Sequence, residues 1–204
     1  MYFSMKHFAN SGFMKKKTIS LFILFFILGL SCTWTASKSQ KKSSATSTTQ
    51  NPYAKYRAEL INYAMTLRGK PYKSGSSGPN AFDCSGFLNY AVKQSLGKYS
   101  LKIEEFPRSA SEIYAKVVKI SPEEREPGDL IFFSENGRIS HVGLYMGRYK
   151  DTNPKNGIDR LDGRFVFINA ASAGPETGVV LSAIDEPYWK RHFYGYGRFL
   201  KSGK

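Results

Sequence analysis

The chain has 204 residues, of which 41% are hydrophobic and 15% aromatic, enough for one packed domain. Its net charge is +14; residues 1–31 hold four lysines and no acid, so 26 cations against 16 acids leave +10 from Cys32 onward. Such a charge suits a polyanionic neighbour, such as anionic lipid or an acidic wall polymer. No nucleic-acid-reading motif accompanies it and the basic residues are spread along the chain, which argues against nucleic-acid binding.

Residues 1–31 have the pattern of an export signal. A basic stretch at 15–17 precedes the apolar run 19–30, which is too short to span a bilayer comfortably, and Met14 is an alternative start. The following Leu28-Gly29-Leu30-Ser31-Cys32 resembles the lipobox of bacterial lipoproteins, with Gly29 where that pattern prefers Leu. We therefore predict a signal peptide over 1–31 and lipid attachment at Cys32, with an uncleaved anchor or ordinary secretion as the alternative.

Residues 32–51 are predicted to form a tether. After Cys32 they are mostly Ser, Thr, Lys and Gln, which have too little apolar surface to offset the entropy of ordering. Lipidation of Cys32 would leave Cys84 as a lone thiol in an exported protein, which must be used or well buried. Thr33 supplies no retention signal of the Asp type, so we expect a lipid-anchored envelope protein at the outer membrane or cell surface.

The folded unit is expected over 52–204. Apolar periodicity predicts helices over 53–67, 84–96 and 107–115. Alternating runs then predict strands over 117–120, 130–134, 140–146, 165–170, 179–182 and 193–200. Asp129, in the turn that enters the second strand, is expected to cap that turn. Helices first and strands after, with short connections, predict an α+β domain with a mainly antiparallel sheet.

Cys84 lies in the first turn of the predicted helix 84–96, with Asp83 as N-cap and Gly97 at its end. Backbone N–H groups and the positive helix end favour a thiolate there. A thiol pKa of about 6.5, instead of about 8.5, would ionise most of the sulfur at neutral pH. The alternative is a buried structural cysteine.

A nucleophilic thiol needs a base, and the chain has three histidines. His7 lies in or before the leader and His192 sits among cations that would lower its basicity, so His141 is the candidate. Asn169 is the one polar residue of the neighbouring strand, and an imidazole N–H would satisfy its amide. A satisfied strand histidine and a strand-end asparagine are the alternatives. With Cys84 the two would form a Cys-His-Asn set.

Six short motifs follow one another between 52 and 200: Gly69-x-Pro71-Tyr72, Phe82-Asp83-Cys84-Ser85-Gly86-Phe87, Pro107-Arg108-Ser109, Pro127-Gly128-Asp129-Leu130-Ile131-Phe132-Phe133, His141-Val142-Gly143-Leu144-Tyr145-Met146-Gly147 and Asn169-Ala170. In type and order they resemble the NlpC-type cell-wall peptidases, papain-like cysteine peptidases of bacteria. The resemblance implies a papain-like α+β core and cleavage of peptidoglycan stem peptides, typically between D-γ-glutamyl and a diamino acid.

Carried over by position, the resemblance makes Cys84 the nucleophile, His141 the base and Asn169 the polar third member, where the family often has His. Tyr72 matches a tyrosine that lies over the nucleophile and helps to bind the oxyanion. Asp83 matches the acidic residue that meets the substrate's free amine, and Ser85 is placed beside it as a substrate-binding residue. The loop where many members carry Trp-Gly-Gly has Ser74-Gly75-Ser76 here.

These features predict a monomeric cysteine endopeptidase that cleaves peptidoglycan stem peptides or muropeptides during wall turnover. No cofactor is needed, and one non-lipidated cysteine and two histidines in the domain cannot build a closed zinc site. A catalytically idle wall-binding lipoprotein with the same groove is the first alternative. A thiol acyltransferase or amidase acting on another substrate is the second.

Overall fold

The computed structural model describes residues 53–97, 107–150, 159–174 and 176–199, all within the unit Ser47–Lys204. The signal peptide, the lipid attachment at Cys32 and the tether lie outside the described residues and stay predictions. Within the described ranges, no helix combines the length and the apolar character needed to cross a membrane.

Three helices come first along the chain: α1 (Ala54–Thr66), α2 (Cys84–Leu96) and α3 (Ala110–Lys116). The predicted cap of α2 is confirmed, because the Asp83 carboxylate accepts the Gly86 N–H at 2.6 Å and the helix ends at Gly97. Helix α3 starts three residues later than predicted, because the Ser109 hydroxyl accepts the N–H of Glu112 and fixes the start there.

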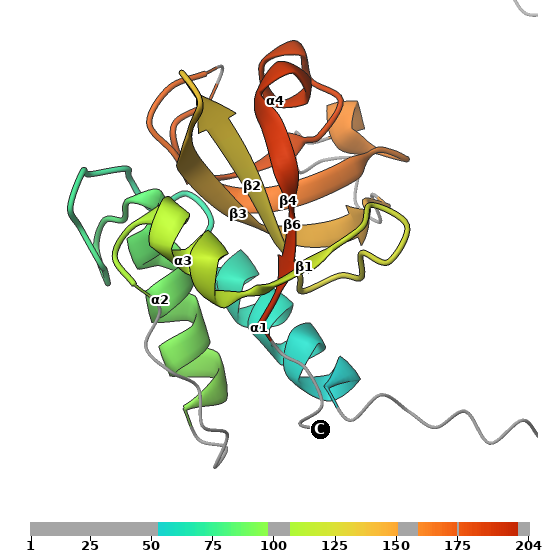
Figure 1. The fold of residues 1–204 in the computed structure, drawn as a ribbon. Helices are drawn as coiled ribbons and strands as arrows, with labels where there is room; N and C mark the ends of the chain where they lie inside the picture. The colour runs from blue at the N-terminus through green and yellow to red at the C-terminus, as the bar shows by residue number, and fades with distance from the viewer. Residues whose placement is uncertain (1–52, 98–106, 151–158, 175, 200–204) are drawn as a thin grey trace, which may run out of the picture. The chain divides into compact units, whose positions relative to one another are not determined.

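The strands form one sheet of six in the order β1-β6-β2-β3-β4-β5, and every neighbouring pair is antiparallel (Figure 1). Their bounds are Val118–Ile120, Leu130–Glu135, Arg138–Arg148, Phe165–Ala171, Gly178–Ala183 and Phe193–Arg198 for β1 to β6. A short 3₁₀ turn, η2 (Asp159–Leu161), precedes β4. The predicted α+β architecture with a mainly antiparallel sheet is confirmed.

The β2–β3 hairpin sets the register of the sheet beside the candidate base. Asn136 and Gly137 both have positive φ, 51° and 73°, as a tight two-residue hairpin turn requires. The register that follows pairs Phe133 with His141 and Ile131 with Gly143. A turn of this kind therefore determines which face of the sheet receives the imidazole.

The two faces of the sheet pack against different layers. One face carries the main core and is covered by α1, α2 and α3, with residues such as Leu60, Leu88, Ile113, Phe132, Leu144 and Ile168. The opposite face carries a smaller aromatic cluster made of Ile131, Phe133, Tyr145, Phe167, Trp189 and Tyr196. Trp189 comes from α4 (Pro187–His192), a six-residue helix that the sequence analysis did not predict because so short a segment shows no helical period.

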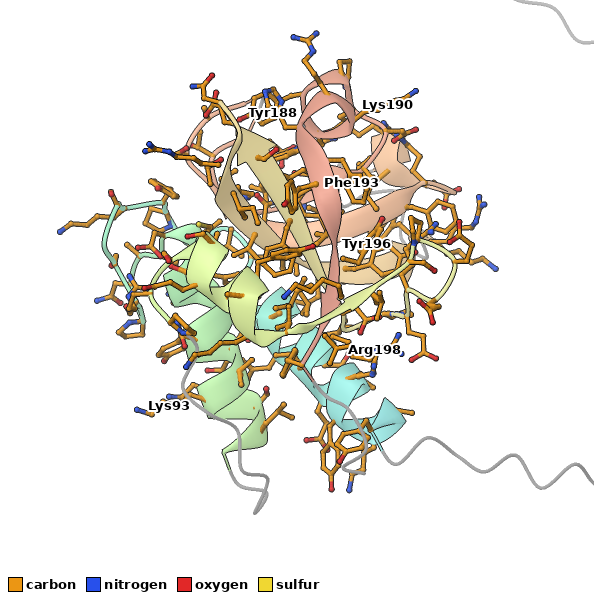
Figure 2. The ribbon with its side chains drawn as sticks, in the orientation of Figure 1. Lys93, Tyr188, Lys190, Phe193, Tyr196 and Arg198 are labelled. Carbon is orange, nitrogen blue, oxygen red and sulfur yellow. The ribbon has the colours of Figure 1, made fainter. Side chains whose placement is uncertain are left out.

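Asp129 does more than the predicted turn cap. Its carboxylate accepts the Glu126 N–H at 2.8 Å, which confirms the cap, but the side chain is only 1% exposed. It also accepts from Arg57 of α1 at 2.9 Å and from Arg198 at 2.8 and 2.9 Å. Arg198 lies at the end of β6 (Figure 2). One buried carboxylate thus joins α1, the turn before β2 and the last strand.

Replacing Asp129 with asparagine should destabilise the domain strongly. The amide keeps the shape but leaves two guanidinium groups without their buried counter-charge, which typically costs about 3–5 kcal/mol. Urea unfolding of the wild type and of Asp129→Asn measures the loss. Glu126→Gln is the matched control, because Glu126 is half exposed and 3.4–3.5 Å from the same arginines, so its loss should stay under about 1 kcal/mol. Equal losses in both variants would contradict this role of Asp129.

Candidate active site

The sulfur of Cys84 lies where the start of α2 meets the backbone of β3. The backbone N–H groups of Ser85 and Val142, with its own amide, lie near enough to the sulfur to favour its thiolate form. The hydrogen-bonded ladder between β3 and β4 begins only at Leu144, so the amide of Val142 lies outside that ladder. Val142 directly follows His141 in β3, so the sulfur of the predicted nucleophile lies beside the strand that carries the predicted base.

The imidazole of His141 is held by Asn169 on β4, with 2.8 Å between His141 Nε2 and Asn169 Oδ1. Asn169 is fully buried, and its amide nitrogen donates to the Val180 carbonyl at 3.4 Å and the Ser182 hydroxyl at 3.1 Å. A carbonyl can only accept, so the amide nitrogen faces β5 and the amide oxygen faces the ring. His141 Nε2 therefore carries the hydrogen, which leaves Nδ1 as the basic nitrogen.

Gly143 allows β3 and β4 to approach beside this hydrogen bond. A Cβ atom at this position would lie 2.6 Å from Phe167 Cδ2 and 3.2 Å from Asn169 Cβ. The first of these distances is too short for any real side chain, so the Phe167 ring or β4 itself would have to shift. The glycine of the His-Val-Gly motif therefore fixes the position of the amide that orients the base.

Trp189 covers the imidazole from α4. The two rings stack with centroids 5.1 Å apart and planes 29° apart, and the ring of Phe133 lies 6.0 Å away. Burial lowers the pKa of His141 from 6.5 to about 4, and the bond to Asn169 opposes part of that fall. His141 is therefore a neutral base over the whole neutral range.

The expected low pKa of the Cys84 thiol is wrong. Burial raises the pKa, the Asp83 carboxylate raises it further, and the surrounding backbone N–H groups oppose both only in part. The N-terminal end of α2 favours the thiolate, but the negative charge of Asp83, which caps that end, opposes it. At neutral pH the site thus holds a thiol and an imidazole, both uncharged, and the proton must move during attack.

The alkylation rate of Cys84 should report this raised pKa. With iodoacetamide the rate should keep rising beyond about pH 9, because only the thiolate reacts. Asp83→Asn keeps a capping side chain but removes the charge, so its inflection should fall to lower pH. A plateau near pH 6.5 in the wild type, or an inflection unmoved by Asp83→Asn, would contradict this account of the thiol.

His141 should also make stability depend on pH. Its pKa is about 4 in the folded protein and about 6.5 when unfolded, so the unfolded chain binds more protons between these values. The stabilisation is present above about pH 6.5 and is lost as the pH falls toward about 4. The free energy of unfolding of the wild type minus that of His141→Gln should therefore shrink over this window in urea titrations. A difference that stays constant or grows on acidification would refute the shift.

Two of the residues predicted to meet substrate lie beside the sulfur. Tyr72 is bridged to Phe82, and burial, then the charges of Cys84 and Asp83, raise its pKa, so its hydroxyl stays a donor. Asp83 is engaged with Arg108, whose Nη2 lies 2.7 Å from one carboxylate oxygen and Nη1 3.2 Å from the other. A substrate amine would have to share this carboxylate with the guanidinium.

Ser85, which was predicted to bind substrate, is buried in the structure. The residue is only 2% exposed, and its hydroxyl donates to the Arg108 carbonyl at 2.7 Å. In this structure it fastens the segment that carries Arg108, and a contact with substrate stays a prediction. Among the described residues, no three His, Cys, Asp or Glu side chains gather in a way that could hold a metal ion.

The structure therefore joins His141 to Asn169 directly and places the sulfur of Cys84 near the backbone of Val142, the residue after His141. Three further side chains at the site had no role assigned from the sequence. Arg108 was inside a recognised motif but had no role. Ser182, which supports the amide, is a polar residue in a fully buried strand and could have been noticed as such. Trp189 lies in the six-residue helix α4, which is too short to show a helical period in the sequence.

Residues 69–198 match the profile of the NlpC/P60 family. The chain belongs to this family. The murein DD-endopeptidase MepH of Escherichia coli K12 is 34% identical over 145 residues, which cover 69% of this chain and 45% of that protein. The gamma-DL-glutamyl hydrolase of Bacillus subtilis 168 is 35% identical over 143 residues, covering 69% of this chain and 29% of that protein.

Solved structures agree with this assignment. An NlpC/P60 family protein from Bacillus cereus superposes with a TM-score of 0.55 at 25% identity, over 71% of this chain and 40% of that one. A lipoprotein-like NLP/P60 family protein from Staphylococcus aureus superposes with a TM-score of 0.53 at 23% identity, over 73% of this chain and 43% of that one. The second likeness shows the fold alone. The chain matches less than half the length of each of these four proteins.

Proposed function

We propose that this protein is a cysteine endopeptidase that hydrolyses peptidoglycan stem peptides, between D-γ-glutamyl and a diamino acid. Membership of the NlpC/P60 family and the relatives named as endopeptidase and γ-glutamyl hydrolase support the substrate class. The observation that carries the proposal is geometric. The sulfur of Cys84 lies near the backbone N–H of Val142, the residue after His141, and Asn169 Oδ1 lies 2.8 Å from Nε2 of that imidazole.

The first half of the reaction begins from the uncharged pair. As the sulfur attacks the amide carbonyl, Nδ1 of His141 takes the thiol proton, and the new C–S bond leaves a negative charge on the carbonyl oxygen. The backbone N–H of Cys84 and the hydroxyl of Tyr72 are the donors proposed for that oxygen. The imidazolium then gives its proton to the leaving nitrogen, the C–N bond breaks and an amine departs.

The second half returns the enzyme. A water molecule loses a proton to Nδ1 and attacks the thioester, the C–S bond breaks, and the sulfur recovers the proton as the acid product leaves. Asn169 acts throughout by keeping the hydrogen on Nε2 and the ring in place, and Trp189 excludes water from one ring face. A negative Asp83 beside the sulfur suits a substrate with a free amine, shared with Arg108.

The location is part of the same proposal. A leader with a basic start and a short apolar run, followed by Cys32 and a polar tether, supports export and lipid anchoring in the cell envelope. Such an anchor would keep the domain beside the wall that its relative MepH, a murein endopeptidase by name, acts on.

Muropeptides of defined stem length test the activity of the full chain. The wild type should release a new free amine at the γ-glutamyl bond, seen by mass spectrometry, and water enriched in heavy oxygen should label the acid product. Cys84→Ala should lose at least about 10³-fold in rate. Asn169→Ala should lose roughly 10- to 100-fold, because the ring is no longer oriented.

Two outcomes would replace the proposal. If the wild type releases no amine yet keeps tight binding to sacculi, the protein is an idle wall binder. If the acyl group passes to an added amine and the acid product carries no heavy oxygen, it is an acyltransferase. Circular dichroism of Cys84→Ala and Asn169→Ala separates lost chemistry from lost folding.

A further inference from the structure

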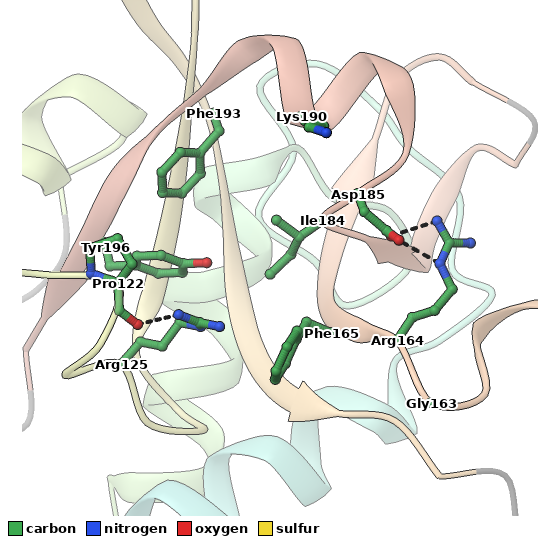
Figure 3. Close-up of a pocket in the computed structure, with 10 residues that line it drawn as sticks. All are labelled: Pro122, Arg125, Gly163, Arg164, Phe165, Ile184, Asp185, Lys190, Phe193 and Tyr196. Atoms are coloured by element: carbon green, nitrogen blue, oxygen red, sulfur yellow. Dashed lines mark hydrogen bonds and ion pairs between the residues drawn. The ribbon is translucent and has the colours of Figure 1, made fainter.

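A cavity of about 380 Å³ lies on the α4 side of the sheet. Its size is within the roughly 300–1,000 Å³ that small-molecule sites occupy. Ten residues line it, and Cys84, His141 and Asn169 are not among them (Figure 3). They are Pro122, Arg125, Gly163, Arg164, Phe165, Ile184, Asp185, Lys190, Phe193 and Tyr196.

One end of the cavity is remote from the catalytic residues, while its other end, at Phe193, pairs with Phe133, the strand partner of His141. Phe165, in its wall, pairs with Arg148 at the far end of β3, whereas His141 lies near the start of that strand. At about 3.3 Å per residue, the strand separates the two positions by roughly 20 Å. A ligand held at the Phe165 end would therefore occupy a second site.

The wall is mainly aromatic and aliphatic. Phe165 is 38% exposed, an unusual degree for a large ring, and Ile184 and Phe193 are half-buried beside the space that Figure 3 shows. Burial raises the pKa of Tyr196 to about 12, so this ring adds no negative charge. An apolar body of one or two rings would cover surface that water now contacts.

The charges around this wall are mostly positive. Arg125, Arg164 and Lys190 line the cavity with one carboxylate, Asp185. Arg164 donates to Asp185 at 2.6 and 2.9 Å, and the charge of Lys190 also helps to lower the pKa of this carboxyl group. Arg125 donates to the Tyr145 hydroxyl and the Pro122 carbonyl and stacks over the ring of Phe165 at 4.8 Å. The charge of Glu123 helps to raise the pKa of Arg125, and no carboxylate in the described part of the chain forms an ion pair with it.

We propose that this cavity binds a soluble organic anion with an apolar body, its acidic group in the field of Arg125 and Lys190 and its body against Phe165 and Tyr196. Within the described ranges, no carboxylate lies at ion-pair distance from Arg125 or Lys190, and two such cations beside an exposed ring select this ligand over a neutral or cationic one. The proposal goes beyond the peptidase activity and does not depend on it.

A matched pair of dyes tests the site. Anilinonaphthalene sulfonate carries an acidic group on an apolar body, and phenylnaphthylamine is the same body without it. In full-length protein with Trp34→Phe, Trp189 is the remaining tryptophan, so energy transfer from it reports a dye bound near α4. The sulfonate should bind with one site per chain and more tightly than the neutral dye.

Charge-changing variants locate the acidic group. Lys190→Gln should weaken the sulfonate about fivefold and leave the neutral dye unchanged. Lys93→Gln is the matched control, since Lys93 is exposed on α2, away from Lys190 on α4 (Figure 2), and should change neither. Phe165→Ala should weaken both dyes. Arg125→Gln should weaken binding of the sulfonate in the same way as Lys190→Gln. Because Arg125 also makes structural hydrogen bonds, the result for Lys190→Gln decides the test if Arg125→Gln does not fold.

Equal affinity for the two dyes would overturn the proposal, as would equal effects of Lys190→Gln and Lys93→Gln. Loss of binding to anionic vesicles in Lys190→Gln, without any change in sulfonate binding, would also overturn it in favour of a membrane surface. Muropeptide cleavage by Lys190→Gln should match that of the wild type, so the result at this site is read separately from the proposed peptidase activity.

Discussion

The catalytic arrangement depends on one close approach, that of β4 to Gly143 of β3. This approach places the buried amide of Asn169 at 2.8 Å from the imidazole of His141. At the same point the β3–β4 ladder has not yet begun, so the amide of Val142 is available to the sulfur of Cys84. The nucleophile Cys84 belongs to the layer of helices, and the base His141 belongs to β3 and packs against the aromatic cluster. The two lie near each other because the hydrogen-bonded ladder between β3 and β4 starts only after Gly143, which has no side chain.

The electrostatics of the site follow from how deeply each group is placed. Desolvation disfavours the charged form of both an acid and a base, so it raises the pKa of the thiol and lowers that of the imidazole. An ion pair between them is therefore disfavoured before substrate arrives. Asp83 adds to this effect while it caps α2, so the residue that stabilises the helix also opposes the thiolate. The Arg108 guanidinium bonds that carboxylate and offsets part of its negative charge beside the thiol.

Most of the fold could be predicted from the sequence because its signals are local. The period of α2, its cap at Asp83 and the alternating runs of the strands each depend on a few neighbouring residues, and all were confirmed. The pairing of Cys84, His141 and Asn169 could be proposed because a base and a polar strand residue are scarce in this chain. What escaped prediction is set by distant contacts. The burial of Asp129 depends on Arg57 and Arg198, some seventy residues away on either side. The pKa of His141 depends on Trp189, in a helix too short to show a period.

Helix α4 contacts both the catalytic imidazole and the cavity on the same side of the sheet. Trp189 stacks on the imidazole, and the next residue, Lys190, lines the cationic cavity. Consecutive residues of a helix point about 100° apart, so one turn can face two neighbouring spaces. The rings of Phe133 and Phe167 pack against Trp189 from the sheet, at 4.7 and 5.1 Å, and hold this turn in place. The position of this six-residue helix thus determines how far water is excluded from the imidazole of His141 and where the charge of Lys190 lies beside the cavity.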